Sequence, residues 1–323
     1  MDVAAEILAV KGLKKYFTFR RSWLGRSLEY VKAVDGIDFH INYGETLGLV
    51  GESGCGKSTT GRTIIRLLAP TEGEIFFEGQ NITHLGKKQL RQVYKHMQLI
   101  FQDPYASLSP RMTVGDALSE VLYIHGMKNG VQRREKTQEL LEIVGIRKEE
   151  MDKYPHEFSG GQRQRVVIAR ALAVNPKLII CDEPVSALDV SIQAQIINLL
   201  MDLKNRLKLA YLFISHDLRV VRHVSDRVAV MYLGKIVETA PTEELFREPA
   251  HPYSKALLSV IPLLRPGNDR KKLVLEGEVP SPINPPSGCR FRTRCKYAAN
   301  KCVESEPDLK CIGRQHFVAC HLY

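Results

Sequence analysis

One loop constrains the fold of this chain more than any other part of the sequence. It reads Gly51-Glu52-Ser53-Gly54-Cys55-Gly56-Lys57-Ser58-Thr59. This loop has the Walker A pattern G-x-x-x-x-G-K-[ST], and it stands between an apolar run at 47–50 and a helical pattern at 58–68. Glycines let the backbone curl so that successive N–H groups surround a phosphate, and the N-terminus of the following helix favours the same anion. Lys57 can then reach the β- and γ-phosphates, and Ser58 can ligate Mg²⁺. A glycine-rich turn before an ordinary helix is the alternative, but the flanking strand and helix favour a phosphate-binding loop.

Four short apolar segments each end beside residues that can do chemistry. The segments are 47–50, 97–101, 178–181 and 211–215, and they run into Gly51, Gln102, the pair Asp182 and Glu183, and His216. Near-continuous apolar runs of this length are typical of buried parallel strands. Helical patterns at 58–68, 162–173 and 192–207 separate several of them, which predicts a doubly wound α/β sheet. Because ligands bind beyond the carboxyl ends of such strands, we expect all four endings to converge on one site.

Two carboxylates follow the apolar strand at 178–181. Asp182 can hold Mg²⁺ directly or through water, and Glu183 is placed to polarise an attacking water. A nucleotide hydrolase needs both, because the metal requires a charge and the nucleophile requires a base. A polar strand-to-loop junction is the alternative, and the phosphate loop elsewhere in the chain favours the catalytic interpretation.

A second glycine motif offers another anion site. It reads Phe158-Ser159-Gly160-Gly161-Gln162-Arg163-Gln164-Arg165. Ser159 can cap the helix that follows, and Gly160 and Gly161 expose backbone N–H groups at its positive end. A chain with two phosphate-binding loops suggests that two copies of the chain face each other across ATP. An ordinary Ser-Gly-Gly helix start is the alternative.

The remaining segments differ in character from the strand-and-helix core. The stretch 103–158 is polar and helical, with helices expected at 115–124 and 131–144, and we interpret it as an insertion between two core strands. A hairpin is expected at 234–238. Beyond Pro241 prolines become dense, which predicts an irregular C-terminal extension.

Composition favours a soluble cytosolic protein. Hydrophobic residues make up 44% of the 323, and no run approaches the roughly 18 apolar residues needed to span a bilayer. The acidic start at 1–6 lacks the features of a signal peptide. The net charge of +10, part of it in a basic segment at about 18–32, favours a solvated surface that attracts ATP. Nucleic acid and anionic lipid are weaker alternatives, because charge alone says little about a partner.

Taken together, these motifs resemble those of the ABC ATPases. Residues 158–165 are similar to the signature of that family, with Phe158 where leucine is usual. Gln102 matches the Q-loop, which in the family contacts Mg²⁺ and water and senses the membrane subunit. Residues 186–189 match the D-loop, and the resemblance implies that Asp189 reaches across a dimer.

The resemblance also assigns the remaining nucleotide contacts. His216 matches the switch histidine at the γ-phosphate, and Tyr16 matches the aromatic that stacks on adenine. Phe17 is the alternative stacking residue, and an ordinary core aromatic is a further interpretation of Tyr16. The implied catalytic residues are Gln102, Glu183 and His216, and the implied magnesium ligands are Ser58, Gln102 and Asp182. The implied ATP-binding residues are Tyr16, Gly51, Ser53, Gly54, Cys55, Gly56, Lys57, Ser58, Thr59, Ser159, Gly160, Gly161, Gln162 and Asp189.

The resemblance is closer to one branch of that family. Segments 102–112, 182–190, 251–258 and 277–289 look like the dipeptide and oligopeptide importer ATPases, and more like the second, F-type subunit than the first. This branch implies an α/β fold with a P-loop (RecA-like) core, an antiparallel β subdomain and a helical insertion at about 103–158. The nucleotide-binding domain would occupy 1–240. An irregular, cysteine-containing C-terminal extension would occupy 241–323.

A chain of this branch would hydrolyse ATP with Mg²⁺ to energise peptide import. The resemblance implies a second ABC ATPase subunit, identical or different, two membrane permeases and an extracytoplasmic substrate-binding protein. It implies a peripheral location at the cytoplasmic face of the membrane and no specific nucleic acid. Import of oligosaccharide or nickel is an alternative. A soluble ABC ATPase that acts on nucleic acid or ribosomes is another, although the single Walker A loop and the lack of a heptad tract count against it.

The cysteines gather near the C-terminal end, and their density indicates metal. In a cytosolic chain such a cluster suggests a metal site rather than disulfides, and four thiolates satisfy either Zn²⁺ or an iron–sulfur cluster. No C-x₂-C spacing occurs, which counts against a zinc ribbon. The tail is similar to the four-cysteine tail of the peptide importers. That likeness implies a [4Fe–4S] cluster on Cys289, Cys295, Cys302 and Cys320, with zinc or free thiols as alternatives, and Cys311 has no match.

Overall fold

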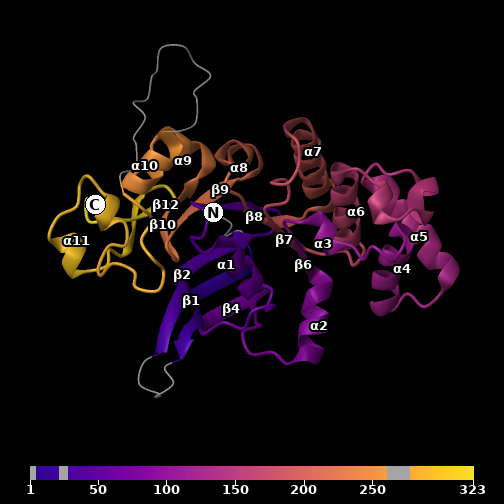
Figure 1. The fold of residues 1–323 in the computed structure, drawn as a ribbon, viewed down its shortest axis with the longest axis horizontal. Coiled ribbons are helices and arrows are strands. Elements are labelled where there is room, and N and C mark those ends of the chain that lie inside the picture. The colour runs from indigo at the N-terminus through magenta and orange to yellow at the C-terminus, as the bar shows by residue number, and fades with distance from the viewer. Residues whose placement is uncertain (1–4, 22–27, 260–276) are drawn as a thin grey trace, which may run out of the picture. The chain divides into compact units, whose positions relative to one another are not determined.

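The computed structural model describes residues 5–21, 28–259 and 277–323 (Figure 1). The chain divides into two compact units. The first unit is formed by 5–7, 42–45 and 85–213, and the second by 8–21, 28–41, 46–84, 214–259 and 277–323. Among the described residues, no helix combines the length and the apolarity that crossing a bilayer requires.

The first unit is built on three strands in the order β8-β7-β6. They are β6 (Met97–Ile100), β7 (Leu178–Asp182) and β8 (Ala210–Ile214). Every residue of β7 and β8 is buried, which explains why their sequences are continuous apolar runs. The pair β6 and β7 is parallel and places Ile100 opposite Cys181, so the two strands end side by side. The predicted parallel strands are confirmed here.

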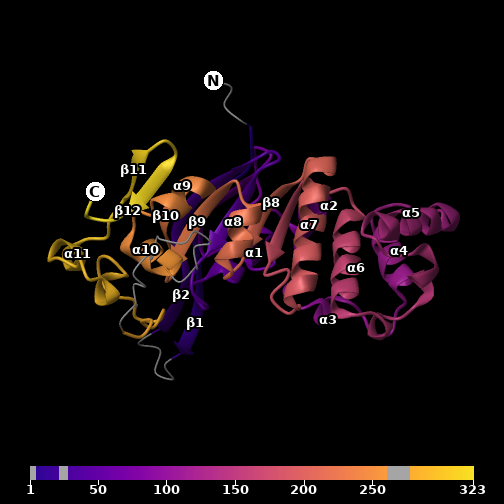
Figure 2. The ribbon, with the colours of Figure 1, turned by 90° about the horizontal axis from the view of Figure 1, so that it is seen from above.

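Helices make up the rest of the first unit. They are α2 (Lys87–His96), α3 (Pro104–Ser107), α4 (Val114–Ile124), α5 (Gly130–Ile143), η1 (Lys148–Asp152), η2 (Pro155–Glu157), α6 (Gly160–Leu172) and α7 (Val190–Leu207). The expected helices at 115–124 and 131–144 are α4 and α5. Helices α4 and α5 pack against each other and on α6, and α6 lies beside α7 (Figure 2).

Five strands of the second unit are neighbours in the order β11-β12-β10-β9-β3. They are β3 (Thr46–Val50), β9 (Arg227–Tyr232), β10 (Lys235–Pro241), β11 (Leu309–Gly313) and β12 (His316–Ala319). Strands β3 and β9 are parallel, and the other described pairs are antiparallel. The expected hairpin joins β9 to β10. It turns at Leu233 and Gly234, which both have positive φ, as a type I′ hairpin turn requires.

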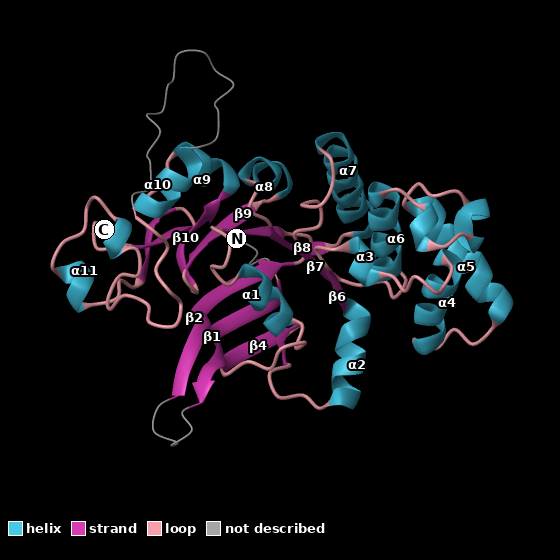
Figure 3. Ribbon diagram, in the orientation of Figure 1, coloured by secondary structure: helices cyan, strands magenta, loops and turns pink. Residues whose placement is uncertain are grey.

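A separate four-stranded sheet also belongs to the second unit (Figure 3). Its order is β2 (Leu28–Asn42), β1 (Glu6–Arg21), β4 (Glu72–Phe77) and β5 (Gln80–Asn81). The pairs β1 with β4 and β4 with β5 are antiparallel. This sheet supplies the expected antiparallel β subdomain.

Two predictions for the second unit need correction, one on a helix and one on the C-terminal segment. Helix α1 (Lys57–Ile64) is shorter than the predicted 58–68, because Arg66 takes a left-handed φ of 63° that a right-handed helix cannot continue through. The segment after Pro241 is also more regular than expected. It contains α9 (Thr242–Arg247), α10 (Pro252–Ser259), η3 (Arg292–Arg294), α11 (Lys301–Glu304), β11 and β12. Because β12 hydrogen-bonds to β10, this segment continues the sheet, and an irregular extension is not confirmed.

Candidate nucleotide site

The Walker A loop leads from β3 into α1 in the second unit. Its glycines are required by the conformation, because a Cβ on Gly56 would collide with the carbonyl oxygen of Ala33 and Gly56 has a φ of 110°. Gly51, with a φ of 155°, closely approaches the carbonyl oxygen of Met231 in the same way. Gly56 is the N-cap of α1 and provides no side chain to occupy the N–H groups of the first turn. The loop is therefore a backbone cradle at a positive helix end, which suits a phosphate.

Lys57 places a buried positive charge inside this loop. Its side chain is only 5% exposed, and its Nζ donates to the carbonyl oxygens of Gly51 and Glu52, each at 2.9 Å. The neighbouring Cys55 thiol lies 3.7 Å from the same Nζ. Burial raises the pKa of Cys55 more than the Lys57 charge lowers it, so the thiol is neutral. Ser58 and Thr59 are half-buried, whereas Ser53 and Gly54 are exposed.

The first unit brings Gln102 and Glu183 together. Gln102 follows β6 and Glu183 follows β7, and the Gln102 Nε2 donates to a Glu183 carboxylate oxygen at 2.9 Å. The parallel register of the two strands produces this contact, since their ends lie side by side. Glu183 has a φ of 49°, a left-handed conformation that is uncommon for a residue with a side chain and that often marks functional sites.

Asp182 is the last residue of β7 and is 1% exposed. A carboxylate that is this deeply buried is stable only with a compensating charge or hydrogen bonds. An oxygen-seeking cation such as Mg²⁺ supplies such a charge, so the donor set fits the magnesium role. Of the other predicted magnesium ligands, Gln102 also lies in the first unit, and Ser58 lies in the second unit.

The signature motif forms the start of α6 in the first unit. Ser159 is the N-cap, its Oγ accepts from the backbone N–H of Gln162 at 3.3 Å, and the Gln162 side chain accepts from the Ser159 N–H at 3.0 Å. The predicted cap is therefore confirmed as a reciprocal capping box. Phe158 is 4% exposed and anchors the motif in the core, while Ser159 stays exposed. A Cβ on Gly161 would strike the Ile192 side chain, so this glycine allows α6 to approach α7.

The remaining predicted residues lie at the surface or at its edge. Asp189 is exposed and is the N-cap of α7, and His216 is exposed just after β8. Tyr16 is half-buried, and its hydroxyl donates to Asp35. The Phe17 ring is 37% exposed, with the Lys15 Nζ 4.9 Å from its centroid. Part of the basic segment at about 18–32 lies outside the described residues.

The prediction of a metal or iron–sulfur cluster at the cysteines is wrong. Within the described parts of the chain, no group of three or more His, Cys, Asp or Glu side chains could hold a metal ion. The thiols of Cys289, Cys295, Cys302 and Cys320 all lie in those parts. Burial raises the pKa of Cys289 to about 11 and also raises the pKa of Cys295 and Cys320. Burial therefore adds a cost to forming the thiolates that a metal would need at these three residues. Cysteine density in the sequence was the misleading signal.

Some residues that contact the Walker A loop carried no role in the sequence interpretation. Tyr253 and Arg294 both bind Glu52. Tyr253 and Arg294 lie 201 and 242 residues from Glu52 in the chain, and no local pattern connects them to it. Tyr253 lies in the segment 251–258, which resembles one branch of importers, whereas Arg294 lies outside the segments that carried this resemblance.

A family model and two solved structures show the general class of this protein. Residues 34–186 match the model of the ABC transporter family. A dimeric post-hydrolysis structure of the ATP-binding cassette MJ0796 with ADP and Pi is similar, with a TM-score of 0.65 and 28% identity over 73% of this chain and 98% of that one. The cbiO1 structure from Clostridium perfringens gives a TM-score of 0.64 and 28% identity over 76% of this chain and 92% of that one. These matches confirm the predicted α/β fold as that of an ABC ATP-binding cassette.

The more similar relatives narrow the class. Residues 237–302 match the model of the oligopeptide/dipeptide transporter C-terminal region. The oligopeptide transport ATP-binding protein AppF of Bacillus subtilis is 56% identical over 98% of this chain and 97% of its own length. The dipeptide transport ATP-binding protein DppF of Haemophilus influenzae is 48% identical, over 97% of this chain and 96% of its own length. The chain therefore belongs to the ABC transporter family, among its oligopeptide and dipeptide transport ATP-binding proteins.

Proposed function

We propose that this chain is the ATP-binding and ATP-hydrolysing subunit of an importer for oligopeptides or dipeptides. The hydrogen bond between Gln102 and Glu183 carries the hydrolytic part of the proposal, since it holds a carboxylate base at the end of a strand beside the buried Asp182. The match of residues 237–302 to the peptide-transporter C-terminal region and the 56% identity to AppF support the peptide part.

Each motif has a proposed role that follows from its chemistry. The Walker A backbone and Lys57 bind the phosphates of ATP, because they present N–H groups and a buried ammonium. Ser58 and Asp182 would hold Mg²⁺, which when bound neutralises phosphate charge. Glu183 accepts a proton from the attacking water, and Gln102 orients that carboxylate. His216 is proposed to contact the γ-phosphate.

The signature residues are proposed to act on a second nucleotide-binding subunit. Ser159 is exposed at the N-terminus of α6, so the positive end of this helix can face an anion held by another molecule. Gly160, Gly161 and Gln162 would contribute to the same contact, with Asp189 reaching the partner subunit. Tyr16 is proposed to stack on adenine. The partner ATPase is identical or different, and both ATPase subunits would lie at the cytoplasmic face of the membrane. Two permeases and an extracytoplasmic substrate-binding protein would complete the importer.

Steady-state ATP hydrolysis by the full-length chain and by Glu183→Gln tests the catalytic assignment. Removing the base should lower kcat by about 100-fold or more while ATP affinity is retained. Glu149→Gln is the matched control, because Glu149 is exposed in the same unit and the same chemical change there should leave kcat unaltered. Normal turnover by Glu183→Gln would show that another group serves as the base.

Transport measurements test the peptide assignment separately. Membrane vesicles that contain the two permeases, this chain with its partner ATPase, and the substrate-binding protein should take up a labelled peptide only with ATP, and Glu183→Gln should abolish that uptake. Uptake of an oligosaccharide or of nickel in place of peptide would reassign the cargo. Retention on nucleic acid or ribosomes at physiological salt would support the soluble alternative, which the relatives do not favour.

A further inference from the structure

A short arginine-rich segment packs beside the Walker A loop in the second unit. It reads Cys289-Arg290-Phe291-Arg292-Thr293-Arg294-Cys295. Phe291 anchors it, since this side chain is 2% exposed and its ring lies 5.3 Å from Tyr232 and 5.5 Å from Tyr253 between centroids. Tyr232 and Tyr253 also contact each other at 4.7 Å. Aromatic pairs at these separations add stability beyond their buried area, so the segment has a fixed position.

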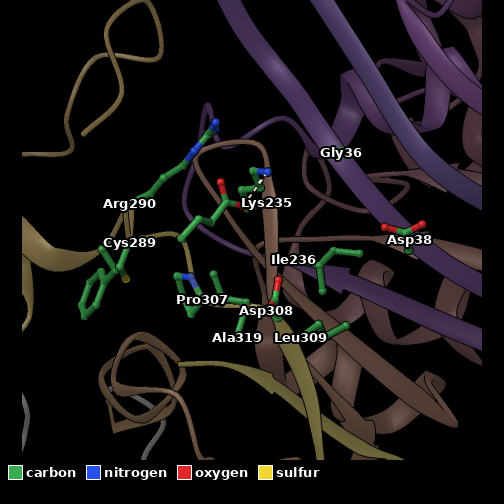
Figure 4. Close-up of a pocket in the computed structure, with 13 residues that line it drawn as sticks. Gly36, Asp38, Lys235, Ile236, Cys289, Arg290, Pro307, Asp308, Leu309 and Ala319 are labelled. Carbon is green, nitrogen blue, oxygen red and sulfur yellow. Dashed lines mark ion pairs between the residues drawn. The ribbon is translucent and has the colours of Figure 1, made fainter. Parts of the chain in front are cut away.

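Arg290 fixes the same segment at a second point. Its side chain is 8% exposed, and its guanidinium donates to the Asp35 carboxylate and to the carbonyl oxygen of Leu233. Although burial alone would raise the pKa of Asp35, the Tyr16 hydroxyl and Arg290 outweigh it and lower that pKa, so the pair is ionised. Figure 4 shows the Arg290 side chain directed away from the Cys289 thiol, with both residues lining a pocket beside β10.

Arg294 extends from this anchored segment to Glu52, the second residue of the Walker A loop. The contact is bidentate, with Nη1 to Oε2 at 2.8 Å and Nη2 to Oε1 at 3.2 Å. The Arg294 side chain is 6% exposed and that of Glu52 is 24% exposed, so the pair is largely shielded from water. Paired planar contacts of this kind fix orientation as well as distance.

Tyr253 holds the backbone of the same residue. The Glu52 N–H donates to the Tyr253 hydroxyl at 2.8 Å, and Tyr253 is fully buried. Glu52 is therefore held by its side chain and by its N–H, while its carbonyl oxygen accepts from Lys57 Nζ at 2.9 Å. A shift of Glu52 would move one of the oxygens that position the Lys57 ammonium.

Arg292 has no part in these contacts. Its Nε donates to the carbonyl oxygen of Ser287 at 2.9 Å, and its Nη2 lies 3.4 Å from the Ser287 hydroxyl. Arg292 and Arg294 therefore have different binding partners although they lie in one segment. Arg292 binds within the C-terminal segment, whereas Arg294 binds the nucleotide loop.

We propose that Arg294 and Tyr253 are positioning residues for the Walker A loop and act through Glu52. They hold the loop in the conformation that receives phosphate, so the loop spends little time in conformations that cannot bind. The apparent Kd for ATP rises as the competent fraction falls, and a fraction of about one tenth gives about a tenfold rise. The inference rests on the proposed function, because it assumes that this loop binds ATP.

The test is the Kd for a fluorescent ATP analogue, measured with the full-length chain and single variants. Arg294→Gln and Tyr253→Phe should each weaken binding by about 5- to 20-fold. Arg292→Gln and Tyr297→Phe are the matched controls, since Tyr297 is 59% exposed, and both should bind like the wild type. Equal affinities for Arg294→Gln and Arg292→Gln would overturn the proposal.

A double-mutant cycle tests the route through Glu52. If Arg294 acts only by holding this carboxylate, Glu52→Gln should weaken binding like Arg294→Gln, and the double variant should be no weaker than either single one. If the affinity losses of the two single variants multiply in the double variant, Arg294 does not act through Glu52. Arg294→Lys keeps one charged contact with Glu52, so its affinity for the analogue should lie between those of Arg294→Gln and the wild type. A general loss of folding would not produce this order among variants that are equally stable.

Thermal unfolding and nucleotide binding by the wild type distinguish a failure of the positioning role from a failure of the proposed function. Thermal unfolding of each variant establishes that the protein is folded, and Arg294→Lys and Glu52→Gln keep the test decisive if Arg294→Gln fails to fold. A wild type that does not bind the analogue would refute the proposed function itself. A wild type that binds, together with variants that bind equally well, would refute only the positioning role.

Discussion

Glu238 offers a stringent test of how the C-terminal segment is attached. Its side chain is fully buried in β10, where one carboxylate oxygen accepts the Ala250 N–H at 2.7 Å and the other accepts the His251 N–H at 2.9 Å. The first oxygen also lies 2.7 Å from Nε2 of His316 on β12. One carboxylate thus joins the start of α10 to the final hairpin.

The substitution Glu238→Ala should cost about 3 to 5 kcal/mol of unfolding free energy. Each buried N–H that loses its acceptor costs about 1 to 3 kcal/mol, which gives about 2 to 6 for the pair. Breaking a buried charge pair costs about 3 to 5 kcal/mol, and this figure overlaps the first because the same carboxylate serves both. Glu248→Ala is the control, since that side chain is 75% exposed, and it should change stability by less than about 0.5 kcal/mol.

Urea unfolding at pH 6, followed by circular dichroism, measures both variants against the wild type. The difference between Glu238→Ala and Glu248→Ala isolates the buried contacts from the general effect of removing a carboxylate. A loss below about 1 kcal/mol for Glu238→Ala would show that water satisfies the freed N–H groups, and the reasoning about the attachment would be refuted.

Further predictions concern the loop, the cap and the pH dependence. Lys57→Ala should weaken ATP binding by about 10- to 100-fold, because a charged hydrogen bond to phosphate is lost, and unchanged affinity in a nucleotide titration would contradict the role. Ser159→Ala should lower stability by about 1 kcal/mol in urea unfolding, because the capping bond of α6 is lost. The hydrogen bond to Glu238 raises the pKa of His316 above 6.5, so its contribution is complete below pH 6.5 and is lost as pH rises through the folded-state pKa. His316→Gln should flatten this alkaline decline in urea midpoints between pH 6 and 9. Burial lowers the pKa of His251 to about 4, so stability should also fall as pH drops from 6.5 towards 4, and an unchanged midpoint there would contradict that assignment.

The motifs of the candidate site were predictable from the sequence because the relevant patterns are local. The glycines of the Walker A loop, the apolar strand before Asp182 and the serine that caps α6 each act within a few neighbours, so their residue types are visible in order along the chain. The contact between Gln102 and Glu183 was also accessible, since parallel strands end at a common edge. Resemblance added the proposed roles of His216 and Asp189, which no spacing would have supplied.

Tertiary structure alone decided what depends on distant parts of the chain. The end of α1 was misjudged because the left-handed turn at Arg66 is not visible as a break in periodicity. Metal was expected from cysteine density, but ligation depends on geometry and on ionised thiols, which density does not determine. Arg294 and Glu52 lie 242 positions apart in the chain, and the packing of Phe291 together with the contacts of Arg290 brings them together. Local patterns therefore determined which chemical groups this protein has, and long-range packing determined which of them meet, because contact energy depends on distance in space and not along the chain.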